Sequence, residues 1–256
     1  GFFNDRVELP ARVSDEHSET PYMTRRAMDF LAEDDGETPW LLHLSYIKPH
    51  WPYVAPAPYN DMYSAKDVIP PVRSDIELNN PNPLMEHLME KVAGKTFSSQ
   101  VAREKVIPVY MGLITQIDDQ LGLLFDFMQE KDLLDDTMVV FTSDHGDYFG
   151  DHWMGDKCYF HDQSVKVPLI IADPSQSADA TRGTTDDSLV ELIDLLPTFI
   201  DYHGGAIEKN VLDGLSLMPK INNVGVAWRE YAISEYDYSC EVFRPKTERL
   251  PLDCRS

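Results

Sequence analysis

The pattern that most constrains this chain is a long helical repeat followed closely by a strand-like run. Between Gln100 and Lys131 the apolar residues recur at the spacing of an amphipathic α-helix, and Pro108 is expected either to kink this helix or to mark its start. Shortly after it, the β-branched and apolar run Thr137–Ser143 predicts a central strand of a parallel sheet. A helix leading into a buried strand is typical of an α/β fold.

The same alternation extends along the chain in both directions. Helices are predicted over Ser18–Asp34 and Ser188–Gly205, the second ending at glycines in a C-cap position. Short apolar runs predict strands over Pro39–Lys48 and Val167–Pro174, and Arg229–Tyr238 is compatible with one more. We therefore expect an α/β fold with a mostly parallel central sheet sandwiched by helices. The apolar face of the first helix is expected to comprise Met23, Ala27, Phe30 and Leu31.

A proline-rich segment over residues 49–72 follows the first predicted strand. Its six prolines exclude regular secondary structure and predict a stiff surface loop. Because the loop also carries several aromatic residues, we expect it to be ordered and functional. Residues 81–98 are interpreted as a polar, variable insertion.

The charge of the chain argues against two classes of partner. Its 256 residues include 22 basic and 44 acidic ones, and the formal net charge of −22 disfavours nucleic acid and anionic membranes. A small anionic substrate would need positive charge supplied locally, by a metal ion or by a few cationic side chains. The oligomeric state stays open, a homo-oligomer included.

Cysteine usage and hydropathy favour the cytoplasm. The three cysteines form neither a disulfide framework nor a CxxC metal motif, which favours a reducing compartment. No apolar run approaches the length of about 20 residues that spans a membrane, and no basic-then-apolar leader is visible. The chain starts at Gly1 without a methionine, which is compatible with a processed protein, a tag remnant or a piece of a longer protein.

Asp144 and His145 are the candidate metal ligands. They follow the predicted strand Thr137–Ser143 directly, and ligands of open α/β sheets bind beyond the carboxyl ends of the strands. A carboxylate beside an imidazole suits one divalent cation, with Ca²⁺, Mg²⁺, Mn²⁺ and Zn²⁺ all open. The alternative is an ordinary turn in which Asp144 caps the next segment and His145 lies at the surface.

Lys157 and His50 are the candidate substrate-binding and catalytic residues. The Lys157 ammonium suits an oxyanion such as sulfate or phosphate, although a solvated lysine paired with Asp156 is the more ordinary explanation. His50 lies between prolines just after the strand predicted over Pro39–Lys48, where it could protonate a leaving oxygen or merely pack. The nearby acids and histidines are interpreted as supporting, capping or solvated groups, namely Asp147, Asp151, His152, Asp156 and His161.

Several of these motifs occur together in one known family. The stretches "VVFTSDHGDYFGDHWMGDK", "VPLIIADP", "ELIDLLPTFIDYHG" and "DGLSLMP" resemble the C-terminal half of the catalytic domain of type I sulfatases, in the alkaline phosphatase superfamily. The stretch "HLSYIKPHWPYVAPAPYNDMY" is similar to the branch that holds phosphonate monoester hydrolases and broad-specificity arylsulfatases. The resemblance extends over about residues 18–238.

The resemblance implies a role for each candidate residue. Asp144 and His145 would bind one divalent metal ion, Lys157 would contact the non-bridging oxygens of the substrate, and His50 would contact the transferred group or the leaving oxygen. The implied activity is hydrolysis of sulfate esters or of phosphonate and phosphate esters.

The nucleophile implied by the resemblance does not match this sequence. Sulfatases use a formylglycine made from the cysteine of a C-x-P-x-R motif, whereas Cys240 begins "CEVFR", lacks the proline and follows the metal motif. We therefore expect residues 1–256 to be a partial sulfatase-type catalytic domain, with the formylglycine only upstream and a small C-terminal sheet domain largely missing. The alternatives are a non-catalytic metal-binding fragment and a two-metal phosphatase or phosphomutase of the same superfamily.

Overall fold

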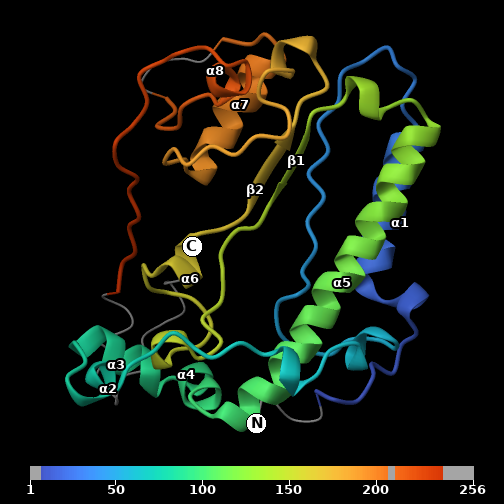
Figure 1. Ribbon diagram of the computed structural model, residues 1–256. Coiled ribbons are helices and arrows are strands. Elements are labelled where there is room, and N and C mark those ends of the chain that lie inside the picture. Colours follow the sequence, from blue (N-terminus) through green and yellow to red (C-terminus); the bar gives the residue numbers. More distant parts are fainter. Residues whose placement is uncertain (1–6, 207–210, 239–256) are drawn as a thin grey trace, which may run out of the picture. The chain divides into compact units, whose positions relative to one another are not determined.

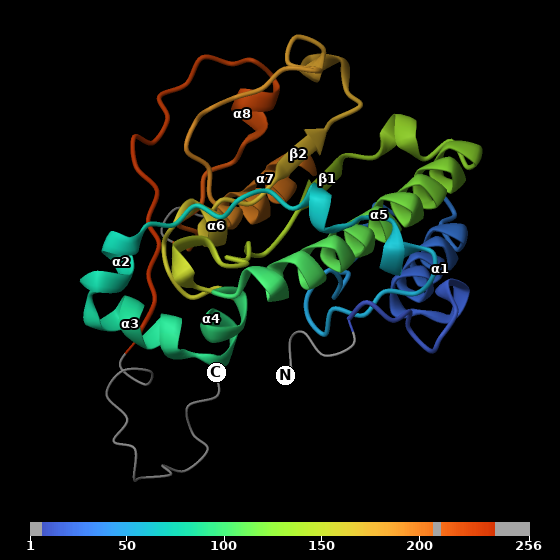
Figure 2. The ribbon, with the colours of Figure 1, turned by 60° about the horizontal axis from the view of Figure 1, so that its bottom comes forward.

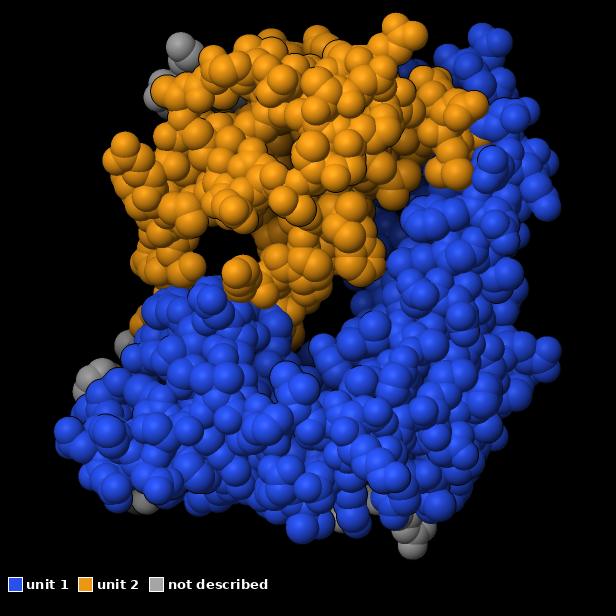
Figure 3. Space-filling model, viewed as in Figure 1, with its two compact units in different colours: residues 1–132, 146–165, 238–256 blue, residues 133–145, 166–237 orange. Residues whose placement is uncertain are grey.

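The computed structural model describes residues 7–206 and 211–238, which divide into two compact units. Unit 1 comprises residues 1–132, 146–165 and 238–256, and unit 2 comprises residues 133–145 and 166–237 (Figure 3). The chain therefore leaves unit 2 after residue 145 and returns to it at residue 166. Each unit is described below by itself.

Unit 1 is built around α5 (Gln100–Glu130), a helix of 31 residues that confirms the predicted long helix. The hydroxyl of Ser99 caps its first turn by accepting a hydrogen bond from the Ala102 amide. Pro108 lies inside the helix and is buried, so it does not mark the start. α1 (Glu19–Ala32) runs alongside α5 (Figures 1 and 2).

The buried face of α1 differs from the predicted one. Buried residues recur at helical spacing as Thr20, Thr24, Ala27 and Leu31. Phe30 is exposed and packs edge-on against Trp40, so its placement on the apolar face was wrong. The Thr24 hydroxyl can join this buried face because it donates to the Thr20 carbonyl oxygen, 3.1 Å away.

The segment between the proline-rich loop and α5 is helical, and that residues 81–98 are a variable insertion stays a prediction. It forms α2 (Asp75–Asn79), α3 (Pro83–Glu90) and α4 (Val92–Phe97). The proline-rich loop itself contains only two short 3₁₀ turns, at Tyr59–Asp61 and Ala65–Asp67, as its prolines predict. Residues of the loop, of α4 and of α5 share one hydrophobic core, which includes Tyr53, Ala55, Tyr59, Phe97, Val106, Val109 and Leu113.

The strand predicted over Pro39–Lys48 does not form among the described residues. Residues 40–47 are extended and alternate strictly between partly buried and exposed, as in a strand with one covered face. A strand also needs a neighbour to pair with its backbone, and the described part of the chain pairs none with this segment. The strand suggested over Arg229–Tyr238 is absent for the same reason.

Unit 2 contains the strands β1 (Val139–Thr142) and β2 (Leu169–Ala172), which confirm two predicted positions. They pair antiparallel, with Val139 opposite Ala172 and Thr142 opposite Leu169, so this pair is not part of a parallel arrangement. The chain leaves β1 and enters β2 at the same end of the pair, whereas parallel strands need a crossover connection. A parallel central sheet sandwiched by helices stays a prediction.

Two helices complete unit 2. The segment predicted as one helix over Ser188–Gly205 forms a 3₁₀ turn at Leu192–Asp194 that continues into α7 (Leu195–Tyr202), and α8 (Met218–Ile221) follows. Gly204 has a positive φ of 71°, which confirms a glycine at the end of this helix. α6 (Asp162–Val165) belongs to unit 1.

Asp194 is fully buried at the start of α7 and is held by a planar arginine fork. Arg229 Nη2 donates to Asp194 Oδ1 at 2.6 Å, and Arg229 Nη1 donates to Asp194 Oδ2 at 2.8 Å. The amides of Leu215 and Glu191 also donate to this carboxylate. The fork therefore ties together three segments of unit 2 that are distant in sequence.

Candidate active site

Asp144 and His145 lie just beyond the carboxyl end of β1 in unit 2, as the sequence predicts. The His145 Nε2 atom is 3.5 Å from Asp144 Oδ2, so both groups can face one small ion. The Asp144 side chain is 88% exposed and that of His145 is 28% exposed, which leaves the carboxylate accessible. The Asp144 Oδ1 atom accepts a hydrogen bond from the His145 amide, and this bond orients the carboxylate.

The donor set of this pair fits a divalent cation in part. An acidic oxygen and a neutral imidazole nitrogen are ligands of Ca²⁺, Mn²⁺, Mg²⁺ or Zn²⁺. Within residues 7–206 and 211–238, no group of three or more histidine, cysteine or acidic side chains is placed to hold a metal ion. The pair accordingly supplies two donors, and a metal shell would need further ligands.

Gly146 allows the backbone to turn directly after the pair. Its amide donates to the Ser164 carbonyl oxygen at 2.8 Å, and a Cβ atom here would collide with the carbonyl of Gln163. A glycine is therefore required by close approach of two backbone segments.

Asp147 is partly buried in unit 1 and contacts the proline-rich loop. The Tyr53 hydroxyl donates to Asp147 Oδ2 at 3.1 Å, and the Phe149 amide donates to Asp147 Oδ1. Burial raises the pKa of the Asp147 carboxyl to about 7, and the charge of Asp156 adds to the rise. The interpretation of Asp147 as a supporting residue agrees with this geometry. Sequence reasoning missed Tyr53, for which only its aromatic character in a proline-rich loop was a signal.

Lys157 lies in a loop over residues 148–161 with unusual backbone geometry. Five of its non-glycine residues have positive φ, namely Phe149, His152, Trp153, Asp156 and Cys158. Such conformations persist only where surrounding contacts hold them. One such contact comes from the buried Arg103 of α5, whose Nε donates to the Phe149 carbonyl oxygen at 2.7 Å. Sequence reasoning missed Arg103 because its partner is distant along the chain.

His50 lies in unit 1 and is partly buried. Its Nδ1 atom is 2.8 Å from the Trp51 carbonyl oxygen, and its ring packs against the Trp51 ring. Because a carbonyl oxygen only accepts, Nδ1 carries a hydrogen and Nε2 is the atom of the ring that can exchange a proton. The structure brings Asp144 and His145 together; that His50 and Lys157 join them stays a prediction, because those residues belong to the other unit.

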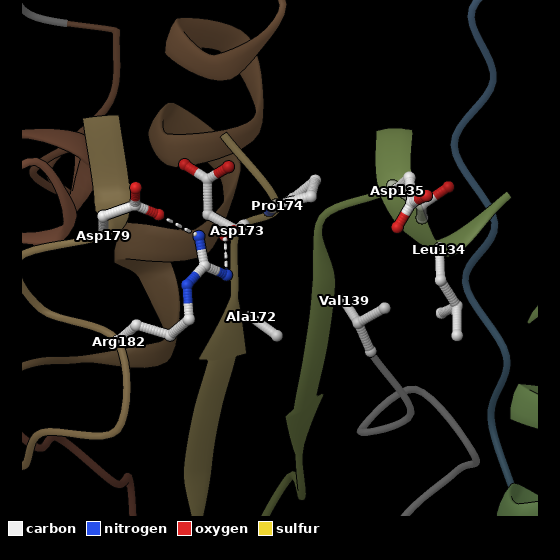
Figure 4. Close-up of a pocket in the computed structure, with 9 residues that line it drawn as sticks. Leu134, Asp135, Val139, Ala172, Asp173, Pro174, Asp179 and Arg182 are labelled. Atoms are coloured by element: carbon white, nitrogen blue, oxygen red, sulfur yellow. Dashed lines mark hydrogen bonds and ion pairs between the residues drawn. The ribbon is translucent and has the colours of Figure 1, made fainter. Parts of the chain in front are cut away.

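A cavity of about 430 Å³ lies elsewhere in unit 2 (Figure 4). It is lined by Val139 and Ala172, at the opposite end of the strand pair from Thr142 and thus from Asp144. Arg182 bonds there to Asp179 at 2.8 Å and to the Asp173 carbonyl oxygen at 3.0 Å. The guanidinium group of Arg182 is therefore already bonded to protein groups. This cavity is distinct from the Asp144–His145 pair.

The family model described as Sulfatase matches residues 4–205. This chain belongs to the sulfatase family. The multifunctional alkaline phosphatase superfamily protein PehA of Trinickia caryophylli is 35% identical to this chain over 250 residues, which cover 91% of this chain and 47% of that one. An arylsulfatase of Clostridium perfringens is 31% identical over 235 residues, covering 92% of this chain and 48% of the relative.

The solved structures show the same fold relationship. A phosphonate monoester hydrolase from Silicibacter pomeroyi superposes with a TM-score of 0.78 at 32% identity, over 89% of this chain and 46% of that one. The described α/β architecture therefore belongs to the sulfatase and alkaline phosphatase type. The chain spans about half the length of the curated relatives it matches and, in its described part, contains no helix that could cross a membrane.

Proposed function

We propose that this sulfatase supplies metal-binding and substrate-binding groups to a hydrolase of sulfate esters or of phosphonate and phosphate esters. The observation that carries the proposal is the pairing of Asp144 Oδ2 and His145 Nε2, 3.5 Å apart, at the end of a strand in a chain of this family. Relatives named as an arylsulfatase and as a phosphonate monoester hydrolase support this substrate class.

Asp144 and His145 would hold one divalent cation, from among Ca²⁺, Mn²⁺, Mg²⁺ and Zn²⁺. When bound, the cation neutralises charge that develops on the transferring group. Lys157 would bind the non-bridging oxygens of the substrate through its ammonium group. Since the net charge of the whole chain is −22, this local cation matters for attracting an anionic ester.

His50 would donate a proton to the leaving alcohol oxygen. Its Nδ1 hydrogen is directed at the Trp51 carbonyl oxygen, which fixes the ring so that Nε2 faces the substrate; Nε2 would donate its proton from the doubly protonated ring and leave the neutral Nδ1–H form behind. The prolines at 49 and 52 restrict the backbone on both sides. His50 thus acts from a fixed ring orientation.

The nucleophile of the reaction would come from outside these residues. None of Cys158, Cys240 and Cys254 lies in a C-x-P-x-R motif, and Cys240 and Cys254 lie outside the described residues. Cys158 is partly buried, with a positive φ of 91°. We therefore propose a formylglycine encoded upstream of Gly1. A non-catalytic, metal-binding chain is the alternative.

A direct assay separates these possibilities. The 256-residue chain and the complete product of its gene are each incubated with an aryl sulfate and with an aryl phosphonate monoester. We expect turnover by the complete product and only background hydrolysis by the 256-residue chain. Turnover by the short chain would disprove the external nucleophile, and inactivity of both with either substrate would favour the non-catalytic alternative.

Lys157→Ala should reduce turnover while leaving the metal bound. Removing one group that stabilises charge in the transition state costs a factor of about 10²–10³ in kcat. Lys166→Ala, which removes an exposed lysine, is the matched control and should keep near-normal turnover. Steady-state kinetics with parallel metal analysis measures both effects. If Lys157→Ala and the control behave alike, Lys157 does not contact the substrate.

A further inference from the structure

Two histidines of the 148–161 loop stack face to face in unit 1. The ring centroids of His152 and His161 are 3.8 Å apart and the ring planes differ by 11°. Tyr148 and Tyr159 pack their rings against His161. The stack therefore sits inside an aromatic cluster on the loop that carries Lys157.

The His152 ring of the stack bonds to Glu77 of helix α2. His152 Nδ1 is 2.7 Å from Glu77 Oε1, and the two side chains are only 16% and 24% exposed. Glu77 also accepts a hydrogen bond from the Ser74 amide, as part of the capping box of α2. Although burial alone would raise it, these hydrogen bonds lower the pKa of Glu77, which favours its anionic form. The loop is thereby attached to α2 through a charged contact.

The His161 ring bonds to Tyr148, at the other end of the same loop. His161 Nδ1 is 3.2 Å from the hydroxyl oxygen of Tyr148, a residue that is almost fully buried. Tyr148 and His161 are the two ends of the loop, so this bond joins its ends. The residues of positive φ between them need such external restraint.

The charges around the stack accommodate one added proton better than two. Among the described residues, the titratable groups beside these rings are the carboxylates of Glu77 and Asp162, the hydroxyl of Tyr148 and the ring of Tyr159. Glu77 can balance a charge on His152. A second proton, on His161, would place two cations in face-to-face contact. Burial, and then the charge of His152, lower the pKa of His161, while Glu77 and Asp162 oppose this shift.

We propose that the His152–His161 stack is a pH-sensitive latch that holds the 148–161 loop closed, and thereby positions Lys157, while His161 is neutral. The positioning of Lys157 for substrate rests on the proposed function. The closure of the loop does not rest on it. His161 acts here through the loop and is a positioning residue.

The direction of the pH effect follows from the lowered pKa of His161. An unfolded or opened chain binds the proton at an ordinary histidine pKa of about 6.5, whereas the closed loop binds it only at lower pH. Closure is therefore fully favoured above about pH 6.5 and is lost as the pH falls from there through the lowered pKa of His161. With one linked proton, the opening equilibrium rises about tenfold per pH unit over that interval.

Nuclear magnetic resonance of the isotopically labelled 256-residue chain tests the latch without any activity. We expect His161 to titrate below the ordinary histidine value of about 6.5. Amide exchange of the 148–161 loop, corrected for the intrinsic effect of pH, should rise about tenfold per pH unit below about 6.5. His161→Phe keeps a ring for stacking but removes the proton, so this rise should disappear. His17→Phe is the control and should leave the rise unchanged.

Two outcomes would overturn the latch. One is a His161 that titrates at or above the ordinary histidine value of about 6.5, which the wild-type protein alone can reveal. The other is loop exchange in His161→Phe that keeps the wild-type dependence on pH. In the complete gene product, His161→Phe should also flatten the acidic limb of the kcat profile. If no hydrolysis is found there, the proposed function fails while the exchange result still decides the latch.

Discussion

Asp144→Ala is expected to remove bound metal and hydrolytic activity together from the complete gene product. The Asp144 carboxylate supplies an anionic donor beside His145 Nε2, and alanine leaves one neutral nitrogen at this point of the site. Because a bound cation contributes several kcal/mol of charge stabilisation, turnover should fall at least about a thousandfold. Metal content by elemental analysis and turnover of an aryl sulfate are the two measurements.

The control for this experiment is another exposed carboxylate of unit 2. Asp187→Ala removes one acidic group and should keep both metal and turnover near normal. Asp144→Asn keeps the size of the side chain but removes its charge, and it should lose most of the metal as well. Normal metal content in Asp144→Ala would show that the Asp144–His145 pair is a turn and not a ligand pair.

Arg229→Ala should cause a large loss of stability in unit 2. It leaves Asp194, which is 0% exposed, as a buried carboxylate without its cation. Breaking a buried ion pair by removing one partner costs about 3–5 kcal/mol, because the remaining charge stays desolvated. The amides of Leu215 and Glu191 would still donate to Asp194, which limits the loss to part of the network.

An exposed arginine offers the matched comparison. Arg182 pairs with Asp179 at 2.8 Å, but the two side chains are 50% and 66% exposed. Surface ion pairs of this kind contribute about 0–1 kcal/mol, so Arg182→Ala should shift the urea midpoint only slightly. Urea unfolding followed by circular dichroism measures both variants. Equal effects of the two substitutions would contradict the role of the Arg229 fork.

Local periodicity predicted the elements that a short segment can specify alone. The repeat between Gln100 and Lys131 corresponds to α5, and the apolar runs around residues 139 and 169 correspond to β1 and β2. The position of Asp144 and His145 followed because a strand end is itself a local feature. The prolines of residues 49–72 likewise exclude regular structure through their own backbone restrictions.

Strand pairing and side-chain contacts between residues far apart in the sequence could not be predicted from local patterns. The run Pro39–Lys48 has the alternation of a strand, yet a strand forms only where a neighbour pairs with it. The antiparallel order of β1 and β2 depends on the path of the connecting chain. The contacts of Arg229 with Asp194 and of His152 with Glu77 join residues that are 35 and 75 positions apart, beyond the reach of any spacing rule.

The contact between the Gly146 amide and the Ser164 carbonyl oxygen bears on the order of folding. It joins the two ends of segment 146–164, which lies between β1 and β2 in the sequence. These two ends are only a few residues from Thr142 and Leu169, the paired residues at the end of the strands. If this contact forms first, the loop that pairing of β1 with β2 must still close is about one-third as long as the full connection between them. The entropy cost of pairing is then lower by about 1 kcal/mol. Segment 146–164, which carries Lys157, then acts as a pre-formed turn, and the two strands can pair with the speed of a local hairpin.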